Sequence, residues 1–193
     1  MQALKVRDIP EFDLSGRKVL GDHFDVEWVP IDDPSASTMP TRKQARELGA
    51  ARFSRGEGAF FAGGSAYFCS TNGGPTERGQ VYRLDIGVSG QNDRLTLIAQ
   101  ADEEDALDRP DNITVAPWGG VFVAEDGKSP NGIFLIRPDG KAIQVARNAV
   151  NSGDSEVTGI CFSPDGKWLF LNIQWEGLTV AVTGPFENLS TVI

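Results

Sequence analysis

The sequence predicts an all-β fold of the β-propeller type, on two observations about the spacing of its apolar residues. Short runs rich in Val, Ile, Phe, Tyr and Trp alternate with clusters of Gly, Pro, Asp and Asn. Turn signals that recur about every 8–12 residues, with little helix between them, are typical of sandwiches, barrels and propellers. A similar segment also returns at roughly 50-residue intervals, which is close to the length of a propeller blade.

Each expected strand is a short apolar run bounded by turn chemistry such as GGS, PWGG or SPDG. The expected strands are, in chain order, GAFFAG, AYFCST, QVYRLD, LTLIAQ, NITVAP, VFVAED, IFLIRP, AIQVAR, VTGICFS, WLFLNIQ and TVAVTG. The one expected helix is TRKQARELGA, with Thr38 or Thr41 as its N-terminal cap and Gly49 at its end.

Three segments align as repeats, and each contains an acid, an apolar strand, a tight turn with Gly and a second strand. They are EGAFFAGGSAYFCST from Glu57, DNITVAPWGGVFVAED from Asp111 and EVTGICFSPDGKWLFLNIQ from Glu156. We therefore expect a single domain over residues 1–193, a partial or half propeller with about three blades of four-stranded antiparallel sheet. In this prediction residues 51–193 form the blades, and residues 1–50 form a connector that carries the short helix.

The acids that lead the three repeats are expected to converge. In a propeller the first strand of each blade lines the central channel, so Glu57, Asp111 and Glu156 would meet there. Gathered carboxylates repel one another, so they take up protons or share a hard cation such as Ca²⁺, Mg²⁺ or iron. Two simpler alternatives stay open, namely a turn acid satisfied by Arg55 for Glu57 and a turn cap for Asp111.

Composition excludes several classes of function. The net charge of −9 argues against nucleic acid or an anionic membrane surface as a partner, because both bind basic patches. No run approaches the ~18 apolar residues of a membrane span, and the N-terminal residues contain no apolar export signal. His23 is the only histidine, which disfavours histidine-based metal or nucleophile chemistry, and Cys69 and Cys161 are expected to be buried.

Three blocks of the sequence carry a family resemblance, from about Trp28 to Pro185. They are RGEGAFF…YFCSTNGG…GQVYRLD, RPDNITVAPWGGVFVAEDG and EVTGICFSPDGKWLFLNIQ…AVTGPF. The chain resembles the C-terminal half of PhoX-type alkaline phosphatases. The resemblance implies a six-bladed propeller with calcium and iron in its channel, hydrolysis of phosphate monoesters and a location outside the cytoplasm.

The resemblance also implies roles for particular residues. It makes Glu57 and Glu156 metal-binding glutamates, and it puts Arg109, Asp111 and Asn112 in a further block near the channel. The family's N-terminal half supplies a cysteine ligand to iron and more acidic ligands, which have no counterpart in this sequence. We therefore expect a fragment or truncated homologue with about half of the family's active site.

The leading hypothesis is a PhoX-like, metal-dependent phosphomonoesterase that acts on a phosphate ester, with no assigned nucleophile. The expected site comprises the metal ligands Glu57, Asp111 and Glu156 and the substrate-binding residues Arg55, Arg109 and Asn112. An alternative is a non-catalytic half-propeller that forms a homodimer completing a propeller, or binds another partner, with at most a structural cation. A weaker rival is a calcium-dependent hydrolase of the lactonase kind.

The remaining acids are expected to be structural or solvated. Asp126, Asp139 and Asp165 precede glycine and are predicted to form tight turns. The acidic run Glu103–Asp105 is predicted to be a solvated loop.

Overall fold

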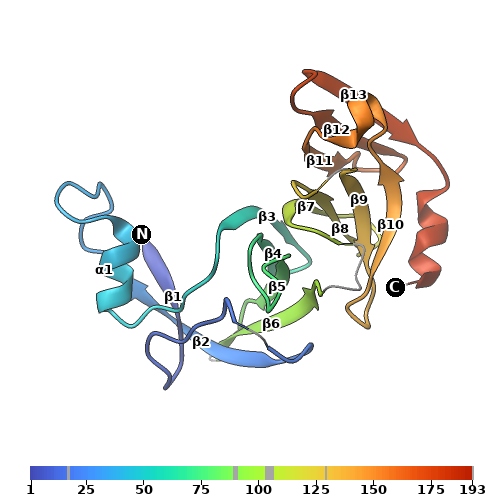
Figure 1. The fold of residues 1–193 in the computed structure, drawn as a ribbon. Helices are drawn as coiled ribbons and strands as arrows, with labels where there is room; N and C mark the ends of the chain where they lie inside the picture. Colours follow the sequence, from blue (N-terminus) through green and yellow to red (C-terminus); the bar gives the residue numbers. More distant parts are fainter. Residues whose placement is uncertain (17, 89–90, 103–106, 129, 193) are drawn as a thin grey trace.

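The structure is a computed structural model that describes residues 1–16, 18–88, 91–102, 107–128 and 130–192. It is nearly all β and consists of antiparallel sheets arranged as a partial propeller, so the predicted fold class is confirmed (Figure 1). The three sheets contain six, four and three strands rather than four each. The second sheet alone has the expected number.

The strands follow the chain from sheet to sheet, and every expected strand is present. In spatial order the first sheet contains β1 (Gln2–Val6), β2 (His23–Pro30), β6 (Asp93–Gln100), β5 (Gln80–Asp85), β4 (Ser65–Ser70) and β3 (Gly56–Ala62). The second contains β10 (Ala142–Arg147), β9 (Gly132–Ile136), β8 (Val121–Glu125) and β7 (Pro110–Val115). The third contains β11 (Val157–Phe162), β12 (Trp168–Ile173) and β13 (Leu178–Thr183). Two short 3₁₀ segments, Val150–Gly153 and Phe186–Val192, complete the described elements.

The N-terminal residues contribute β1 and β2 to the edge of the first sheet, where β2 pairs with β6.

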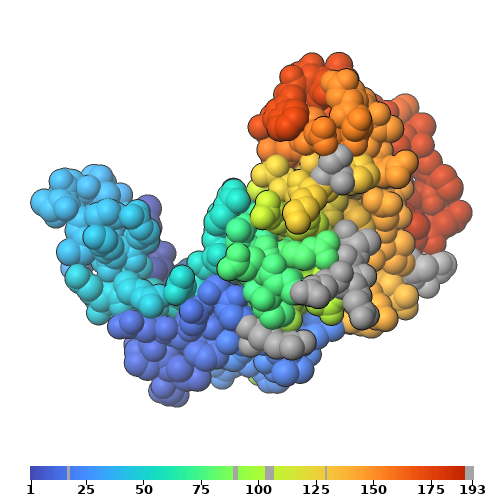
Figure 2. Space-filling model, viewed as in Figure 1, coloured from blue at the N-terminus to red at the C-terminus, as the bar shows by residue number. Residues whose placement is uncertain are grey.

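The expected helix is α1 (Thr41–Glu47), and it projects to one side of the molecule (Figure 2). Its predicted threonine cap is wrong, because Pro40 is the N-cap residue and no side chain caps the helix. The proline ring fixes φ at −53° and leads the chain into the helix without a capping hydrogen bond. Gly49 follows the helix with φ of +80°, as its predicted role requires.

The two central strands of the second sheet are buried on both faces, since β8 and β9 have no exposed residue. Alternate side chains point in opposite directions along a strand, so one set packs against each neighbouring sheet. Phe122, Ala124, Ile133 and Leu135 belong to the core shared with the third sheet. Val123, Phe134 and Ile136 belong to the core shared with the first sheet. Full burial of one such large side chain contributes about 1.5–3 kcal/mol, so these two interfaces hold the sheets together.

The inner strands of the three sheets lie side by side, because β7 contacts β3 on one side and β11 on the other. Each of the three contains a β-bulge near its beginning. The pairing shifts between Gly56 and Ala59 in β3, between Pro110 and Asn112 in β7, and between Thr158 and Cys161 in β11. A bulge bends its strand and changes the direction of its side chains. The bulges therefore determine how the first residues of each inner strand are presented.

Gly58 allows β3 and β7 to approach closely. A Cβ atom at this position would lie 2.6 Å from the carbonyl oxygen of Asp111 and 2.8 Å from Cα of Asn112. By contrast, a Cβ atom on Gly56 would meet nothing within 4 Å. The two glycines that flank Glu57 thus have different roles, and only Gly58 is required by packing.

None of the helices in the described ranges is long and apolar enough to cross a membrane.

Replacement of Gly58 by alanine is expected to lower the free energy of unfolding by about 1–3 kcal/mol, because the added methyl group forces β3 and β7 apart. The matched control, Gly56→Ala, is expected to change it by less than about 0.5 kcal/mol. Urea denaturation of both variants measures the difference. Equal stabilities for the two variants would show that the close approach at Gly58 is not required.

Candidate functional site

The inner strands place the three predicted acids at one end of the sheets. Glu57 lies on β3, Asp111 lies in the bulge of β7, and Glu156 directly precedes β11. A fourth acid, Asp126, follows β8. We call Glu57, Asp111, Asp126 and Glu156 the acid cluster, since their charges influence one another's ionisation.

The pKa values of Asp111 and Glu156 show that the acids have converged. Burial, followed by the charges of Glu57 and Asp126, raises the pKa of Asp111 above its ordinary value. Burial, followed by the charges of Asp111 and Asp126, raises the pKa of Glu156 to about 6. The side chains of Asp111 and Glu156 share a hydrogen bond in which the protonated Glu156 carboxyl donates. The carboxyl groups of Asp111 and Glu156 therefore lie close enough to influence each other's ionisation.

The predicted alignment of the third repeat is wrong by two residues. In each sheet, a backbone hydrogen bond joins the residue just before the inner strand to the residue just after the strand that pairs with it. These bonds are Thr71 N–H to Arg55 O (2.9 Å), Asp126 N–H to Arg109 O (3.1 Å) and Gln174 N–H to Glu156 O (3.1 Å). Glu156 is thus equivalent to the two arginines, and Thr158 is equivalent to Glu57 and Asp111. The sequence alignment matched the leading acids by residue type, whereas strand pairing matches residues by position.

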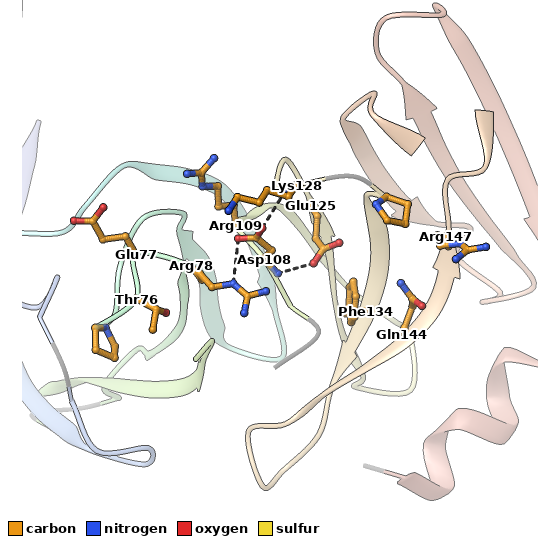
Figure 3. Close-up of a pocket in the computed structure, with 12 residues that line it drawn as sticks. Thr76, Glu77, Arg78, Asp108, Arg109, Glu125, Lys128, Phe134, Gln144 and Arg147 are labelled. Carbon is orange, nitrogen blue, oxygen red and sulfur yellow. Dashed lines mark hydrogen bonds and ion pairs between the residues drawn. The ribbon is translucent and has the colours of Figure 1, made fainter. Parts of the chain in front are cut away.

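The two predicted substrate-binding arginines lie in different surroundings. Both have left-handed backbones, with φ of 51° for Arg55 and 55° for Arg109. A guanidinium nitrogen of Arg55 lies 3.3 Å from a carboxylate oxygen of Glu57, and the charge of Arg55 also lowers the pKa of Asp111. Arg109 instead lines a cavity between the first and second sheets (Figure 3). Arg55 is therefore the arginine that belongs to the acid cluster.

Asn112 connects two inner strands. Its side-chain oxygen accepts a hydrogen bond of 2.9 Å from the backbone N–H of Ile160, which lies in the bulge of β11. On the other side of β7, the hydroxyl group of Thr71 donates a hydrogen bond of 2.8 Å to the carbonyl oxygen of Pro110. These side chains hold β7 against its neighbours and so fix Asp111 close to Glu156. The Asn112 amide oxygen, predicted to contact substrate, already has a backbone partner.

The cysteines differ in exposure. Cys69 is buried as predicted, and burial together with the charges of Asp111 and Glu57 raises the pKa of its thiol. Cys161 is exposed, so its predicted burial is wrong. It pairs with Phe170 on the face of the third sheet that is turned away from the second sheet. An apolar run alone does not show which face of a strand is covered.

Among the other predicted turn acids, Asp139 and Asp165 accept hydrogen bonds from the backbone N–H groups of Lys141 and Lys167, as their turns require. Asp126 is the residue that sequence reasoning missed, since the AEDG pattern indicated only a turn. The acidic run Glu103–Asp105 lies outside the described residues.

The donor set of the acid cluster is suited to a hard cation, because all of its side chains offer carboxylate oxygens. Within the described ranges, however, no three His, Cys, Asp or Glu side chains are already assembled around one point. The side chains present therefore fit a metal ion in chemistry but do not form a finished coordination sphere.

Fold and site together define the class of this protein, a propeller-type β protein whose inner strands gather carboxylates and an arginine at one end. The family model of alkaline phosphatase PhoX matches residues 1–177 of the 193-residue chain. The chain belongs to the PhoX alkaline phosphatase family. The match includes β1 and most of β2, which precede the region of resemblance found from motifs. A search of curated proteins found no match.

Replacement of Asp111 by asparagine is expected to lower the pKa of Glu156 from about 6 toward 4.5, because it removes a neighbouring negative charge and a hydrogen-bond acceptor. Burial of Glu156 remains and keeps the pKa above 4.5. Carboxyl ¹³C NMR titration of metal-free protein measures the shift. Asp139→Asn, at the β9–β10 turn, serves as the control. An unchanged pKa of Glu156 in Asp111→Asn would show that the two acids do not interact.

Proposed function

We propose that this chain carries part of a metal-dependent phosphomonoesterase site at the acid cluster. The observation that supports this most directly is the convergence of Asp111 and Glu156, whose carboxyl groups raise or alter each other's pKa. Two carboxyl groups held together against their mutual repulsion gain from a cation that replaces a proton. Membership of a phosphatase family agrees with this proposal.

Glu57, Asp111 and Glu156 are the residues proposed to hold the metal. Calcium takes six to eight oxygen ligands in flexible geometry, so carboxylates on three strands suit it, and iron also accepts carboxylate ligands. Because no finished group of three donors is present in the described ranges, binding requires the side chains to move or further donors to take part. When bound, the metals would act as Lewis acids on the phosphoryl oxygens and position the attacking hydroxide.

Arg55 is proposed to bind the phosphoryl group. Its guanidinium can donate two parallel hydrogen bonds to phosphate oxygens. In the structure it pairs with Glu57, and the two side chains are 52 % and 36 % exposed. Such an exposed pair contributes little, so Arg55 can exchange Glu57 for a phosphate at small cost. The amide nitrogen of Asn112 remains as a donor, since the amide oxygen is engaged by Ile160.

Calcium binding at pH 6 is expected to release protons, because Glu156, with a pKa of about 6, is partly protonated there and ionises when it binds the cation. Calorimetry in two buffers with different ionisation enthalpies counts these protons. Glu156→Gln should bind calcium at least about tenfold more weakly and release fewer protons. Glu57→Gln should also bind calcium more weakly but still release protons. Glu47→Gln, on the exposed side of α1, should match the wild type in calcium affinity and in proton release.

Hydrolysis of p-nitrophenyl phosphate in the presence of Ca²⁺ and Fe³⁺ tests the activity with the same proteins. The rate should fall at least about tenfold in Glu57→Gln and remain unchanged in Glu47→Gln. Metal-independent rates that are equal in wild type and Glu57→Gln, or a wild-type protein that binds no calcium, would contradict the proposal.

A second candidate function is a non-catalytic half-propeller that pairs with a second copy of itself. The outer face of the third sheet supports it, because Trp168 and Phe170 are 43 % and 38 % exposed while the alternate residues of β12 are buried. The corresponding outer face of the first sheet is covered by residues such as Phe12, Leu14 and Phe53. Among the described residues, the outer face of the third sheet is thus open and apolar, whereas that of the first sheet is covered.

Size-exclusion chromatography with light scattering is expected to show a dimer near twice the 20.8 kDa chain mass if this second function applies. Phe170→Ser should then yield monomers, while Phe61→Ser, at an exposed position of β3 in the first sheet, should leave the mass unchanged. A wild-type protein that remains monomeric at high concentration would rule the pairing out.

A further inference from the structure

Four buried polar side chains lie in the segments that carry the acids of the second and third sheets. They are Glu125 at the end of β8, Asn131 before β9, Asn148 after β10 and Ser155 before β11. None of the four residues is more than 7 % exposed. A buried polar group lowers stability unless it is hydrogen-bonded, so the partners of these side chains show which segments they hold together.

The side chain of Asn131, which is fully buried, joins the backbone beside two acids of the cluster. Its amide oxygen accepts a hydrogen bond of 2.8 Å from the backbone N–H of Gly127, the residue after Asp126. Its amide nitrogen lies 3.4 and 3.3 Å from the carbonyl oxygens of the two residues before Glu156 and donates to both. One side chain thus bridges the second sheet next to Asp126 and the third sheet next to Glu156.

The backbone of Asn131 is itself fixed to the connection between β10 and β11. Its N–H donates a hydrogen bond of 3.0 Å to the carbonyl oxygen of Gly153, and its carbonyl oxygen accepts one of 2.8 Å from the N–H of Asn148. The two segments also pack closely, because a Cβ atom on Gly153 would lie 2.6 Å from Cβ of Pro130. The bridge is therefore anchored at both its backbone and its side chain.

Glu125 extends this network toward the third acid. Its two carboxylate oxygens accept hydrogen bonds from the backbone N–H groups of Asp108, at 2.6 Å, and Gly132, at 2.9 Å. Figure 3 shows the Glu125 carboxylate turned toward Asp108, which lies three residues before Asp111. The network therefore runs from the entry of β7 to the entry of β11.

Asn148 has similar chemistry but a more local role. Its amide nitrogen donates a hydrogen bond of 3.1 Å to the carbonyl oxygen of Ser155, and its amide oxygen accepts one of 2.9 Å from the N–H of Val150. Both partners of this side chain lie in the connection between β10 and β11. Asn148 thus shapes one connection, whereas the Asn131 side chain joins two sheets.

We propose that Asn131 is a positioning residue of the acid cluster, which holds Asp126 and Glu156 at a fixed separation and thereby sets the affinity of the cluster for a cation. Like charges move apart unless the backbone beside them is held. Carboxylates that are already held in place lose less conformational freedom when they bind an ion. The effect on affinity rests on the proposed metal site, whereas the bridge itself is a property of the metal-free chain.

Asn131→Asp and Asn148→Asp form a matched pair that tests this proposal in the full chain. Each variant keeps the shape and the acceptor oxygen of a buried asparagine and replaces the donor to the Ser155 carbonyl by an oxygen. Both should therefore lower the urea midpoint by similar amounts. Calcium affinity, measured by isothermal titration at pH 8, should fall at least about fivefold in Asn131→Asp and should not fall in Asn148→Asp. An added negative charge alone would strengthen calcium binding, so weaker binding reports the lost bridge.

Crystal structures of the metal-free proteins separate the bridge from the proposed function. In Asn131→Asp the new carboxylate faces two carbonyl oxygens, so Glu156 should move away from Asp126 by about 1 Å or more, and in Asn148→Asp the separation should match the wild type. If the buried charge prevents folding, Asn131→Ala and Asn148→Ala replace the pair with the same expectations.

An unchanged separation in the metal-free Asn131 variant, or an equal loss of calcium affinity in the two variants, would overturn the proposal. A wild-type protein that binds no calcium would overturn the proposed metal site instead. The metal-free structures would then still decide whether Asn131 positions the two acids.

Discussion

The close contact between β3 and β7 at Gly58 is the constraint on which the arrangement of this protein depends. A backbone carbonyl oxygen of β7 occupies the place that a side chain would fill, so the two inner strands are nearly in contact. Across β7, the Asn112–Ile160 hydrogen bond ties β11 to the same strand. These contacts bring together residues that are far apart in the sequence. Without them, Glu57, Asp111 and Glu156 would be three separate acids on three separate sheets.

Such convergence opposes stability. Burial and mutual repulsion raise the pKa values of Asp111 and Glu156, which means that their charged forms are disfavoured in the folded chain. The apolar interfaces on both faces of the second sheet supply the opposing free energy. A fold that keeps carboxyl groups together at this cost has a site in which a cation is stabilising, which is the physical basis of the proposed metal site. The solvated Arg55–Glu57 pair beside it is held much less tightly.

The sequence predicted the strands well because their signals are local. Every run bounded by Gly, Pro, Asp or Asn turns became a strand, and the repeat of three segments predicted three sheets. What it could not predict depends on pairing between strands. Strand pairing places Glu156 two positions before the equivalent of Asp111, and it brings Asp126, at the end of β8, to the cluster. The exposure of Cys161 likewise depends on which face of β11 another sheet covers.

The acid cluster and the cavity between the first and second sheets, which Arg109 lines, differ in the charge of their side chains. The backbone carbonyl group of Arg109 binds the N–H of Asp126 in the cluster, while its side chain lines the cavity. Arg109, the residue before β7, thus lies between the carboxylates of the acid cluster and the cavity. With a net charge of −9, the chain repels anions over most of its surface. An anion meets the carboxylates of the acid cluster favourably only where a cation has already bound them.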